Sequence, residues 1–256
     1  MPLNPLSTSA FAFIEQADAF YAALTHRKPH LGGHLLYAAE LTEAARPAIV
    51  AANIAGAATL SVSADQPFAK QAMRDGIVDF LVNSLDEALR ILKNEIRKRE
   101  AVAVCVTAAP QAIEQEMRDR GVRPDLTLSG TEIELTSQAG AITLSHIAAS
   151  AEERVWLTWR PAQSAALWLP KLDALALAGL PPEAATTRRW LERAPRYLGR
   201  ITRNLRVLRL TQQQADQLIA AFSHQLTIGA VSATIEITLG PWTSPTTKTL
   251  QSLPDP

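Results

Sequence analysis

A single cysteine, Cys105, stands among 256 residues. One thiol cannot form a disulfide within the chain or build a cysteine-rich zinc site, and it suits a reducing compartment. The 25 Lys and Arg residues balance 25 Asp and Glu residues, so no net charge draws the whole chain to nucleic acid or to an anionic membrane. The N-terminus has no signal-peptide pattern, and no apolar run reaches the ~20 residues of a membrane span. We therefore expect a cytoplasmic protein with no membrane and no nucleic-acid partner.

Glycine is missing from the connection between the first predicted strand, residues 35–39, and the helix predicted for residues 42–55. With a second strand at residues 59–62, this unit has the form that dinucleotide-binding proteins use to hold a diphosphate. In those proteins glycines in the connection let backbone N–H groups touch the phosphates. Here Glu40 and Glu43 place negative charge where an anion would lie. The sequence predicts no cofactor at this position, and NAD is an alternative only if the altered loop still admits it.

Strands and helices alternate regularly through the first half of the chain. Further strands are predicted at residues 78–82, 101–106 and 126–128, separated by helices. Ser84 and Glu87 predict a capping box at the start of one helix, and Pro110 suits the first position of the next. This alternation predicts an α/β fold with a Rossmann-like parallel sheet and helices on both faces.

The pattern changes after residue 129. A hairpin is predicted from strands at residues 132–136 and 141–147, and a strand at 154–159 is followed by Pro161. An apolar stretch interrupted by Pro170, two helices and a strand at residues 233–239 follow. We predict a smaller C-terminal α+β portion. The predicted division of the chain is an N-terminal arm and helix at 1–24, the Rossmann-like domain at 25–131, the α+β portion at 132–240 and a tail at 241–256.

Three blocks in residues 31–131 resemble the nucleotide-binding segment of urocanase (urocanate hydratase). They lie at residues 51–60, 86–89 and 120–125, and their order and spacing match that family. The resemblance implies a Rossmann-like domain that binds NAD tightly as an electrophile, water addition to urocanate, and a homodimer.

The chain departs from the urocanase pattern at the positions that carry this chemistry. The family's glycine-rich loop falls on residues 39–45, its acidic residue after the second strand on Ser63, and a nearby arginine on Phe68. Of its Asp-Gln-Thr-Ser stretch only Thr131 is kept, and Cys105 does not match the family's catalytic cysteine. We therefore predict a urocanase-like protein that has lost NAD-dependent hydratase activity and acts as a binding or assembly module, as a homo-oligomer.

The residual crevice at the carboxyl ends of the strands is the predicted place for a small ligand. Its candidate residues are Glu40, Thr42, Ser63, Asp65, Asn83, Thr107, Ser129 and Thr131. The alternative function is a lyase-like or hydratase-like enzyme that uses this crevice for an anionic substrate, with Glu40 as general base. Asp65 could replace the family's ribose-binding carboxylate, but its position favours an N-cap for the next helix.

Two further residue types carry weaker signals. His26, His30 and His34 are spaced by four, yet Pro29 and two glycines break any helix that could align them, so no metal site is predicted. Cys105 lies between valines in a predicted core strand, where a thiol is inert.

Arginines are concentrated between residues 188 and 209. Five of them follow steps of four and three residues, so on one helix they would form a single stripe: Arg189, Arg193, Arg196, Arg200 and Arg203. Guanidinium groups bind phosphates and carboxylates in a bidentate manner, so this stripe predicts an anion-binding surface. A structural or interface role is the alternative, and Pro195 and Gly199 are expected to break or bend the helix.

Overall fold

The computed structural model describes residues 6–129, 132–135, 141–143, 154–241 and 245–251. The chain divides into two compact units. The parallel-sheet unit comprises residues 8–150 and 196–200, and the antiparallel-sheet unit comprises residues 1–7, 151–195 and 201–256. Within the described part of the chain, no helix combines the length and the apolar character needed to cross a membrane.

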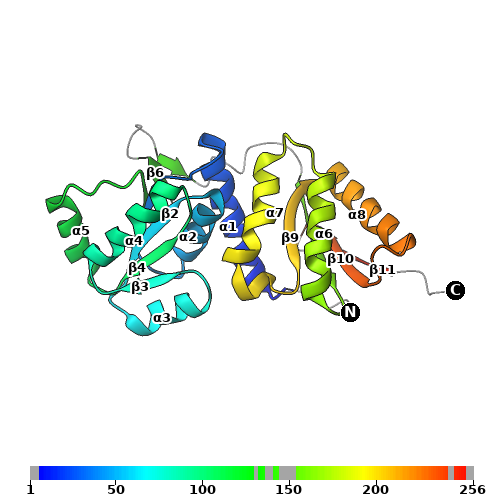
Figure 1. The fold of residues 1–256 in the computed structure, drawn as a ribbon, viewed down its shortest axis with the longest axis horizontal. Helices are drawn as coiled ribbons and strands as arrows, with labels where there is room; N and C mark the ends of the chain where they lie inside the picture. The colour runs from blue at the N-terminus through cyan, green and yellow to red at the C-terminus, as the bar shows by residue number, and fades with distance from the viewer. Residues whose placement is uncertain (1–5, 130–131, 136–140, 144–153, 242–244, 252–256) are drawn as a thin grey trace. The chain divides into compact units, whose positions relative to one another are not determined.

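The parallel-sheet unit is built on five parallel strands in the order β3-β4-β2-β1-β5 (Figure 1). The strands β6 and β7 continue the sheet beyond β5 in antiparallel pairing. The bounds are β1 Leu35–Glu40, β2 Ala58–Val62, β3 Phe80–Val82, β4 Ala103–Val106, β5 Leu126–Ser129, β6 Glu132–Leu135 and β7 Ala141–Thr143. The predicted α/β fold with a Rossmann-like parallel sheet is confirmed.

Helices cover both faces of this sheet. The helices are α1 Thr8–Arg27, α2 Arg46–Ala55, α3 Gln66–Arg74, α4 Leu85–Lys98 and α5 Pro110–Asp119. Leu89 of α4 and Ile113 of α5 pack on the face formed by Leu60 and Val104. On the other face Thr59 Oγ1 lies 3.5 Å from Asn53 Oδ1 of α2. All ten residues of α2 are buried, because α1 packs against its outer side (Figure 1).

The predicted helix starts at Ser84 and Pro110 are confirmed. The Glu87 N–H donates to Ser84 Oγ at 3.3 Å, so Ser84 is the N-cap of α4. The Glu87 carboxylate accepts the N–H of Asn83 at 2.9 Å, one residue earlier than in the usual capping box. Pro110 opens α5, where its missing N–H costs nothing.

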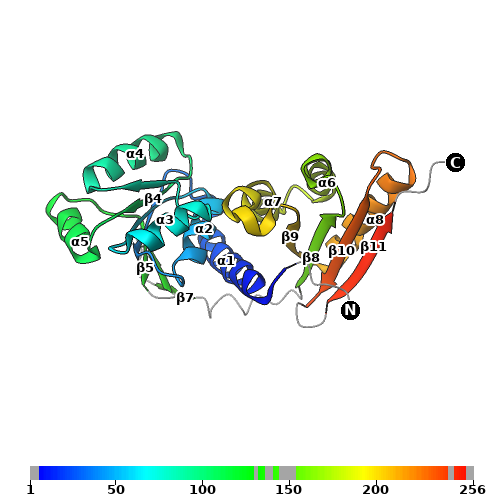
Figure 2. The same cartoon turned by 90° about the horizontal axis from the view of Figure 1, so that it is seen from below.

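The antiparallel-sheet unit has a four-stranded sheet in the order β11-β10-β8-β9. Figure 2 shows β8, β10 and β11 side by side, with α8 behind them. The bounds are β8 Arg154–Pro161, α6 Ala165–Gly179, α7 Ala185–Tyr197, η2 Gly199–Thr202, β9 Arg206–Thr211, α8 Gln212–Thr227, β10 Thr234–Gly240 and β11 Thr246–Gln251. Trp159 of β8 packs on Phe222 of α8 with ring centroids 5.6 Å apart, and both are buried. This contact marks the face of the sheet that carries the core.

An ion pair that is largely withdrawn from water joins α6 to β9. Arg206 donates from Nε and Nη2 to Asp173 Oδ2 at 2.9 and 2.8 Å. Its Nη1 donates to the carbonyl oxygens of Thr202 and Leu205. Burial raises the pKa of Asp173 above its usual value, and the Arg206 guanidinium opposes this shift only in part.

Two segments differ from the sequence predictions. Residues 246–251, expected in a tail, form β11, which pairs with β10 along its length. The β-branched threonines suit a strand, and Leu250 is buried at 7% exposure, so pairing and one apolar contact suffice. Helix α6 continues through Pro170, because Leu169 and Leu172 are buried on either side of it and this packing outweighs one lost hydrogen bond.

The hairpin β6–β7 joins the parallel sheet at β5, so the predicted boundary at residue 131 falls between paired strands. An added antiparallel pair covers the edge that β5 would otherwise expose. The ends of the two predicted hairpin strands, residue 136 and residues 144–147, lie outside the described residues. The strand predicted to stop before Pro161 includes it as the last residue of β8.

Candidate functional site: the carboxyl ends of the parallel strands

The end of β1 has a backbone conformation that glycine adopts most easily. Tyr37 pairs with Leu60 and Glu40 with Val62, so β1 has one more residue than β2 over this stretch. Ala39 lies in this bulge with φ 48°, in the left-handed region. A side chain in this region costs about 1–2 kcal/mol. Residue 39, the first position onto which the resemblance places the family's glycine-rich loop, therefore has a glycine-type backbone although alanine occupies it.

The helix after β1 starts four residues later than predicted. The sequence indicated Thr42 as the start, whereas α2 begins at Arg46. Thr42 closes a separate turn: its hydroxyl accepts the Ala45 N–H at 3.2 Å, and its carbonyl accepts the N–H groups of Ala45 and Arg46 at 3.2 Å. Pro47 then supplies no N–H. Of the amide groups at this helix start, those of Ala45 and Arg46 are therefore used within the turn, and Pro47 has none.

Arg46 is a buried cation at the same helix start. Its Nη1 lies 3.4 Å from Glu43 Oε1 and 3.3 Å from Asp75 Oδ2. Its guanidinium carbon lies 4.5 Å above the centre of the Phe68 ring. Arg46 is 8% exposed, and its Nε has no hydrogen-bond partner among the described residues. The guanidinium is thus held between two carboxylates and an aromatic face.

NAD, the cofactor that the urocanase resemblance implies, can be tested against this geometry. A Rossmann-type site needs free amides at the helix start and space for the backbone to approach the diphosphate. Thr42 occupies two of these amides, and Glu43 adds negative charge beside the only buried cation of this turn. The residues present do not fit a diphosphate held in the usual way.

Ser63 and Asp65, after β2, are occupied in local turns. The Ser63 hydroxyl donates to the Asp65 carbonyl and accepts the Asp65 N–H, each at 3.2 Å. The Asp65 carboxylate accepts the Phe68 N–H at 3.0 Å, which makes Asp65 the N-cap of α3. The capping interpretation of Asp65 is confirmed. The Phe68 side chain lies under Arg46, at the position that carries an arginine in the family.

Asn83 and Thr107 tie the ends of β3 and β4 together. The Thr107 hydroxyl lies 2.9 Å from Asn83 Oδ1 and 3.1 Å from the Val82 carbonyl oxygen. The Asn83 N–H is taken by Glu87. These polar groups stabilise the strand ends, and the structure assigns them partners within the fold.

The remaining crevice candidates are less defined. Glu40 is exposed at the end of β1. Ser129 ends β5, but its side chain is not described, and Thr131 lies outside the described residues. A ligand role for these eight candidates stays a prediction.

Tyr37 is a titratable group near the middle of the sheet that the sequence did not indicate. Its hydroxyl lies 3.3 Å from Glu114 Oε1 on α5. Burial, and then the Glu114 carboxylate, raise the pKa of Tyr37 well above its usual value. The phenol therefore stays protonated and ties β1 to α5.

The five arginines of the predicted stripe do not share one helix. Arg189, Arg193 and Arg196 lie on α7, whereas Arg200 lies in η2 and Arg203 follows it. The helix continues through Pro195 and ends at Tyr197, before Gly199 with φ 52°. Arg196 and Arg200 belong to the parallel-sheet unit and the other three to the antiparallel-sheet unit. The anion-binding surface therefore stays a prediction.

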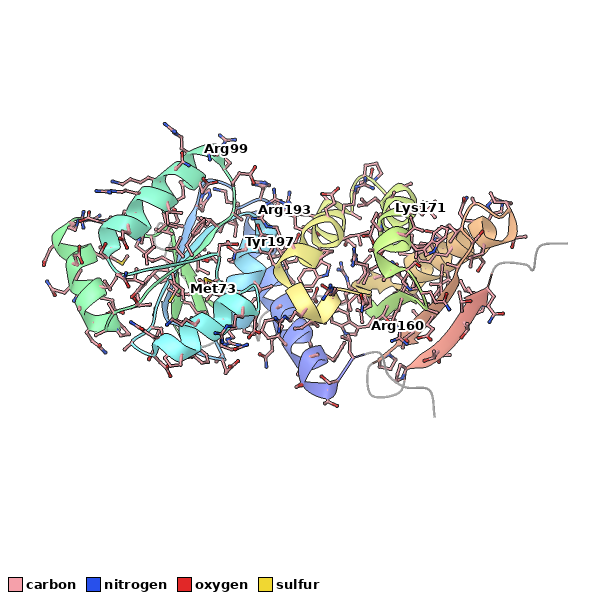
Figure 3. All side chains as sticks on the ribbon, turned by 60° about the horizontal axis from the view of Figure 1, so that its bottom comes forward. Met73, Arg99, Arg160, Lys171, Arg193 and Tyr197 are labelled. Atoms are coloured by element: carbon pink, nitrogen blue, oxygen red, sulfur yellow. The ribbon has the colours of Figure 1, made fainter. Side chains whose placement is uncertain are left out.

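Neighbouring arginines have structural partners. Arg188 Nη1 donates to the carbonyl oxygens of Leu177 and Leu180 at the end of α6. Arg206 pairs with Asp173, and the Arg209 guanidinium lies 5.9 Å from the centre of the Trp156 ring. Figure 3 labels Arg193 and Tyr197 on α7, and Arg196 stacks on Tyr197 at 5.2 Å. Part of the arginine cluster thus holds the fold together.

The surroundings of Cys105, His30 and His34 are described by the structure. Cys105 is completely buried in β4, and burial raises the pKa of its thiol. His30 Nδ1 accepts the Gly32 N–H, and His34 Nε2 lies 2.6 Å from Lys28 Nζ. Within the described ranges, no three His, Cys, Asp or Glu side chains are grouped so that they could hold a metal ion.

Sequence reasoning missed Arg46, the central residue of this region. Its spacing from Glu43, three positions earlier, is a signal for a helix-type ion pair. Its other partners could not be found by spacing, since Asp75 is 29 positions away.

Five parallel strands with helices on both faces define a Rossmann-like α/β domain. Residues 18–136 match the family model of the urocanase Rossmann-like domain. This part of the chain is therefore similar to urocanase, and the predicted resemblance is confirmed. In the family this domain binds NAD, and the match ends before β7.

Proposed function

We propose that this urocanase-related protein does not use NAD at its parallel-strand ends and acts as a binding or assembly protein. The observation that carries the proposal is the start of α2. Thr42 uses the N–H groups of Ala45 and Arg46, and the Arg46 guanidinium is held by Glu43 and Asp75. The groups that would bind a diphosphate are already engaged with one another.

Binding a diphosphate here would carry several costs. Two backbone hydrogen bonds in the turn would be lost, at about 0.5–1.5 kcal/mol each. The phosphate charges would lie beside Glu43, which repels them. The Arg46 guanidinium would have to leave Phe68 and its carboxylates to reach the ligand. These costs favour a protein that leaves the position without a cofactor.

The direct test compares thermal unfolding with and without NAD, together with the loss of urocanate absorbance over time. We expect no saturable change in Tm at millimolar NAD and no consumption of urocanate, alone or with NAD. A ligand at 100 times its Kd stabilises by about 2.7 kcal/mol, so tight binding would be visible. A saturable rise of several degrees with NAD, or turnover of urocanate, would overturn the proposal.

A double variant separates the effect of the loop charges from that of the turn. Glu40→Gly together with Glu43→Gly removes the repelling carboxylates and adds two glycines. We expect no measurable NAD affinity in this variant, because Thr42 still holds the amides of Ala45 and Arg46. Measurable affinity in the double variant would mean that the acidic side chains alone exclude the cofactor.

The alternative of an enzyme with Glu40 as general base gains little from the geometry. A general base works near a bound substrate and away from bulk water. The Glu40 side chain is exposed, and the neighbouring polar groups of Thr42 and Ser63 are engaged in turns. Binding is the better-supported role.

Homo-oligomer formation and anion binding complete the proposal. Light scattering of the purified chain should give the mass of a dimer if the urocanase resemblance extends to assembly. A monomeric mass would contradict the predicted homo-oligomer.

Anion binding by the arginines is tested by thermal shift with inorganic phosphate. The double variant Arg193→Ala with Arg196→Ala should abolish any rise in Tm that phosphate causes. A rise in Tm with phosphate that the arginine double variant keeps would contradict the predicted anion-binding surface.

A further inference from the structure

Two adjoining hollows lie at one end of the antiparallel sheet, where β8 leads into α6 and where β10 begins. Their volumes are about 310 and 340 Å³. Both are lined by Ala162, Gln163 and Ser164, the segment between β8 and α6, so they meet at this segment, and we call them together the depression. This size is typical of small-molecule sites, which begin at about 300 Å³.

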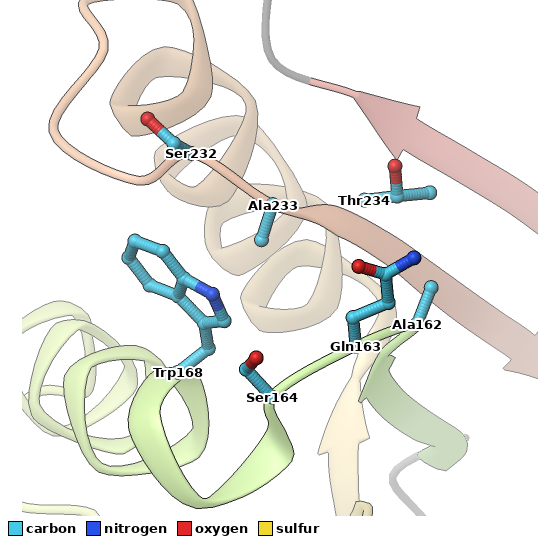
Figure 4. Close-up of a pocket in the computed structure, with 7 residues that line it drawn as sticks. All are labelled: Ala162, Gln163, Ser164, Trp168, Ser232, Ala233 and Thr234. Carbon is cyan, nitrogen blue, oxygen red and sulfur yellow. The ribbon is translucent and has the colours of Figure 1, made fainter.

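The first hollow combines one aromatic side chain with hydrogen-bonding groups. Figure 4 shows Trp168 and Ser164 on one side, Ser232 and Thr234 on the segment across from them, and Gln163 at the end near Thr234. Lys171 Nζ lies 4.5 Å from the centre of the indole ring, which restrains the ring on α6. Three hydroxyls and a carboxamide can each donate and accept. The lining is thus mainly polar, with groups of both hydrogen-bonding kinds, and it includes the indole of Trp168.

Ser164 is held in an unfavourable backbone conformation at this position. It precedes α6 with φ 52° and ψ 44°, in the left-handed region, and its side chain does not cap the helix. A serine before a helix normally accepts an N–H of the first turn. Backbone strain of this kind costs about 1–3 kcal/mol and is concentrated at functional sites. The exposed hydroxyl of Ser164 faces the hollow (Figure 4).

The second hollow adds two charges that compensate each other. Arg160 donates from Nε and Nη2 to Glu236 Oε2 at 3.0 and 2.5 Å. Both side chains are about one third exposed, at 37% and 35%, and Asn204 lines the same wall. The position of Arg160 can be followed in Figure 3. Because the charges are paired, this wall presents planar polar groups without a net charge.

We propose that this depression binds a small polyhydroxylated molecule of the sugar or cyclitol class. Such a molecule has hydroxyls that donate and accept at once, which suits carboxamides, hydroxyls and an Arg–Glu pair. It also has a C–H face that packs on an indole. A free anion would find Glu236 beside Arg160, and an apolar ligand would leave the hydroxyls unpaired.

This site lies within the antiparallel-sheet unit alone. It stands whether or not the parallel-strand ends bind NAD, and the two experiments use different ligands. A failed sugar test leaves the first proposal unaffected, and NAD binding leaves this one unaffected.

The test is saturation-transfer NMR on the full chain with D-glucose, D-ribose and myo-inositol, each at millimolar concentration. Glutamate and inorganic phosphate serve as anionic comparisons. We expect a saturable signal from at least one of the three polyhydroxylated probes and a stronger one than from either anion. No signal from all three probes, or preference for an anion, would overturn the proposal.

Variants then locate the site. Trp168→Ala and Gln163→Ala should each raise the Kd of the probe by about three- to tenfold, as expected for one lost contact of about 0.5–1.5 kcal/mol. Leu167→Ala is the matched control, since Leu167 lies on the same turn of α6, is 54% exposed and does not line the hollows. Circular dichroism of each variant verifies folding. Equal affinity of wild type, Trp168→Ala and Gln163→Ala for the probe would mean that the probe binds elsewhere, and would contradict the assignment.

Ser164→Gly should change Tm and probe affinity in opposite directions, which would not happen if Ser164 had only a structural role. Glycine relieves the left-handed strain, so Tm should rise by about 2–4 °C. The lost hydroxyl should weaken the probe several-fold. A variant with higher Tm and unchanged binding would show that Ser164 has no part in the site.

Discussion

The polar side chains at the end of the parallel sheet and those at the end of the antiparallel sheet have opposite roles. At the carboxyl ends of the parallel strands, Thr42, Ser63 and Thr107 bond to nearby backbone or side-chain groups. At the end of the antiparallel sheet, Gln163 and Ser164 line an open depression. The first edge is where the fold family places its ligand, and the second has groups that a ligand can still reach. The parallel-strand ends therefore show the relation to the fold family. The end of the antiparallel sheet has the hydrogen-bonding groups that a ligand could use.

A related contrast holds for one ion-paired arginine in each unit. Arg206 has both carboxylate contacts at or below 2.9 Å, and its side chain and that of Asp173 are 13% and 18% exposed. Arg46 has longer contacts, of 3.3 and 3.4 Å, to side chains that are 30% and 72% exposed. The carboxylate partner of Arg206 is largely withdrawn from water, whereas the carboxylate partners of Arg46 keep more of their contact with solvent. The variants below test this difference.

Arg206→Met should have the largest effect. It leaves the Asp173 carboxylate buried without its cation, which costs about 3–5 kcal/mol. Urea unfolding followed by tryptophan fluorescence measures the loss, because Trp159 lies in the same core. The double variant Asp173→Leu with Arg206→Met should regain most of this free energy. A loss below about 1 kcal/mol for the single variant would mean that the pair is not a buried one.

Arg46→Met should cost less, about 1–2 kcal/mol, from the stacking on Phe68 and two weak ion pairs. Its carboxylate partners keep their contact with water after the change, so no charge is left stranded. Arg46→Lys is the matched control, since it keeps the charge and loses the planar stacking. If Arg46→Met proved as damaging as Arg206→Met, the contrast between the two arginines would fail.

Ala39→Gly should raise the free energy of unfolding by about 0.5–1 kcal/mol. Glycine relieves the strain at φ 48°, and its greater freedom in the unfolded chain offsets part of the gain. Ala38→Gly is the control, because Ala38 is buried in β1 without a positive φ and should lose stability. Two losses would show that the bulge does not strain Ala39.

The sequence predicted the parallel sheet because its signals are local. Residues 103–106 form a continuous apolar strand buried on both faces, and Asp65 and Ser84 cap helices within three residues. β11 was missed because only Leu250 of its residues is buried, so no alternation is visible. Its stability comes from pairing with β10, which is a tertiary property.

The sites were harder to predict than the fold. The partners of Arg46 include Asp75, 29 positions away, and the fold alone brings them together. The depression collects residues 160–165 with Trp168, Asn204, and residues 232–234 with Glu236, three segments that share no spacing. In contrast, the altered loop at residues 39–45 could be recognised in the sequence, because its glycines are missing from fixed positions.

The smallest expected effect is a pH dependence centred on Asp173. Burial raises its pKa in the folded chain, so over a window above the usual Asp value the folded state keeps a proton that the unfolded state has lost. This contribution to stability is fully present below the unfolded-state pKa and disappears as pH rises through the raised pKa. Unfolding free energies across this window should therefore show wild type losing stability relative to Asp173→Asn as pH rises, because the amide does not titrate. Carbon-13 NMR of the Asp173 carboxyl provides the direct measurement. An apparent pKa at or below the usual Asp value would mean that Arg206 outweighs burial, and that this pair is as accessible to water as the Arg46 contacts.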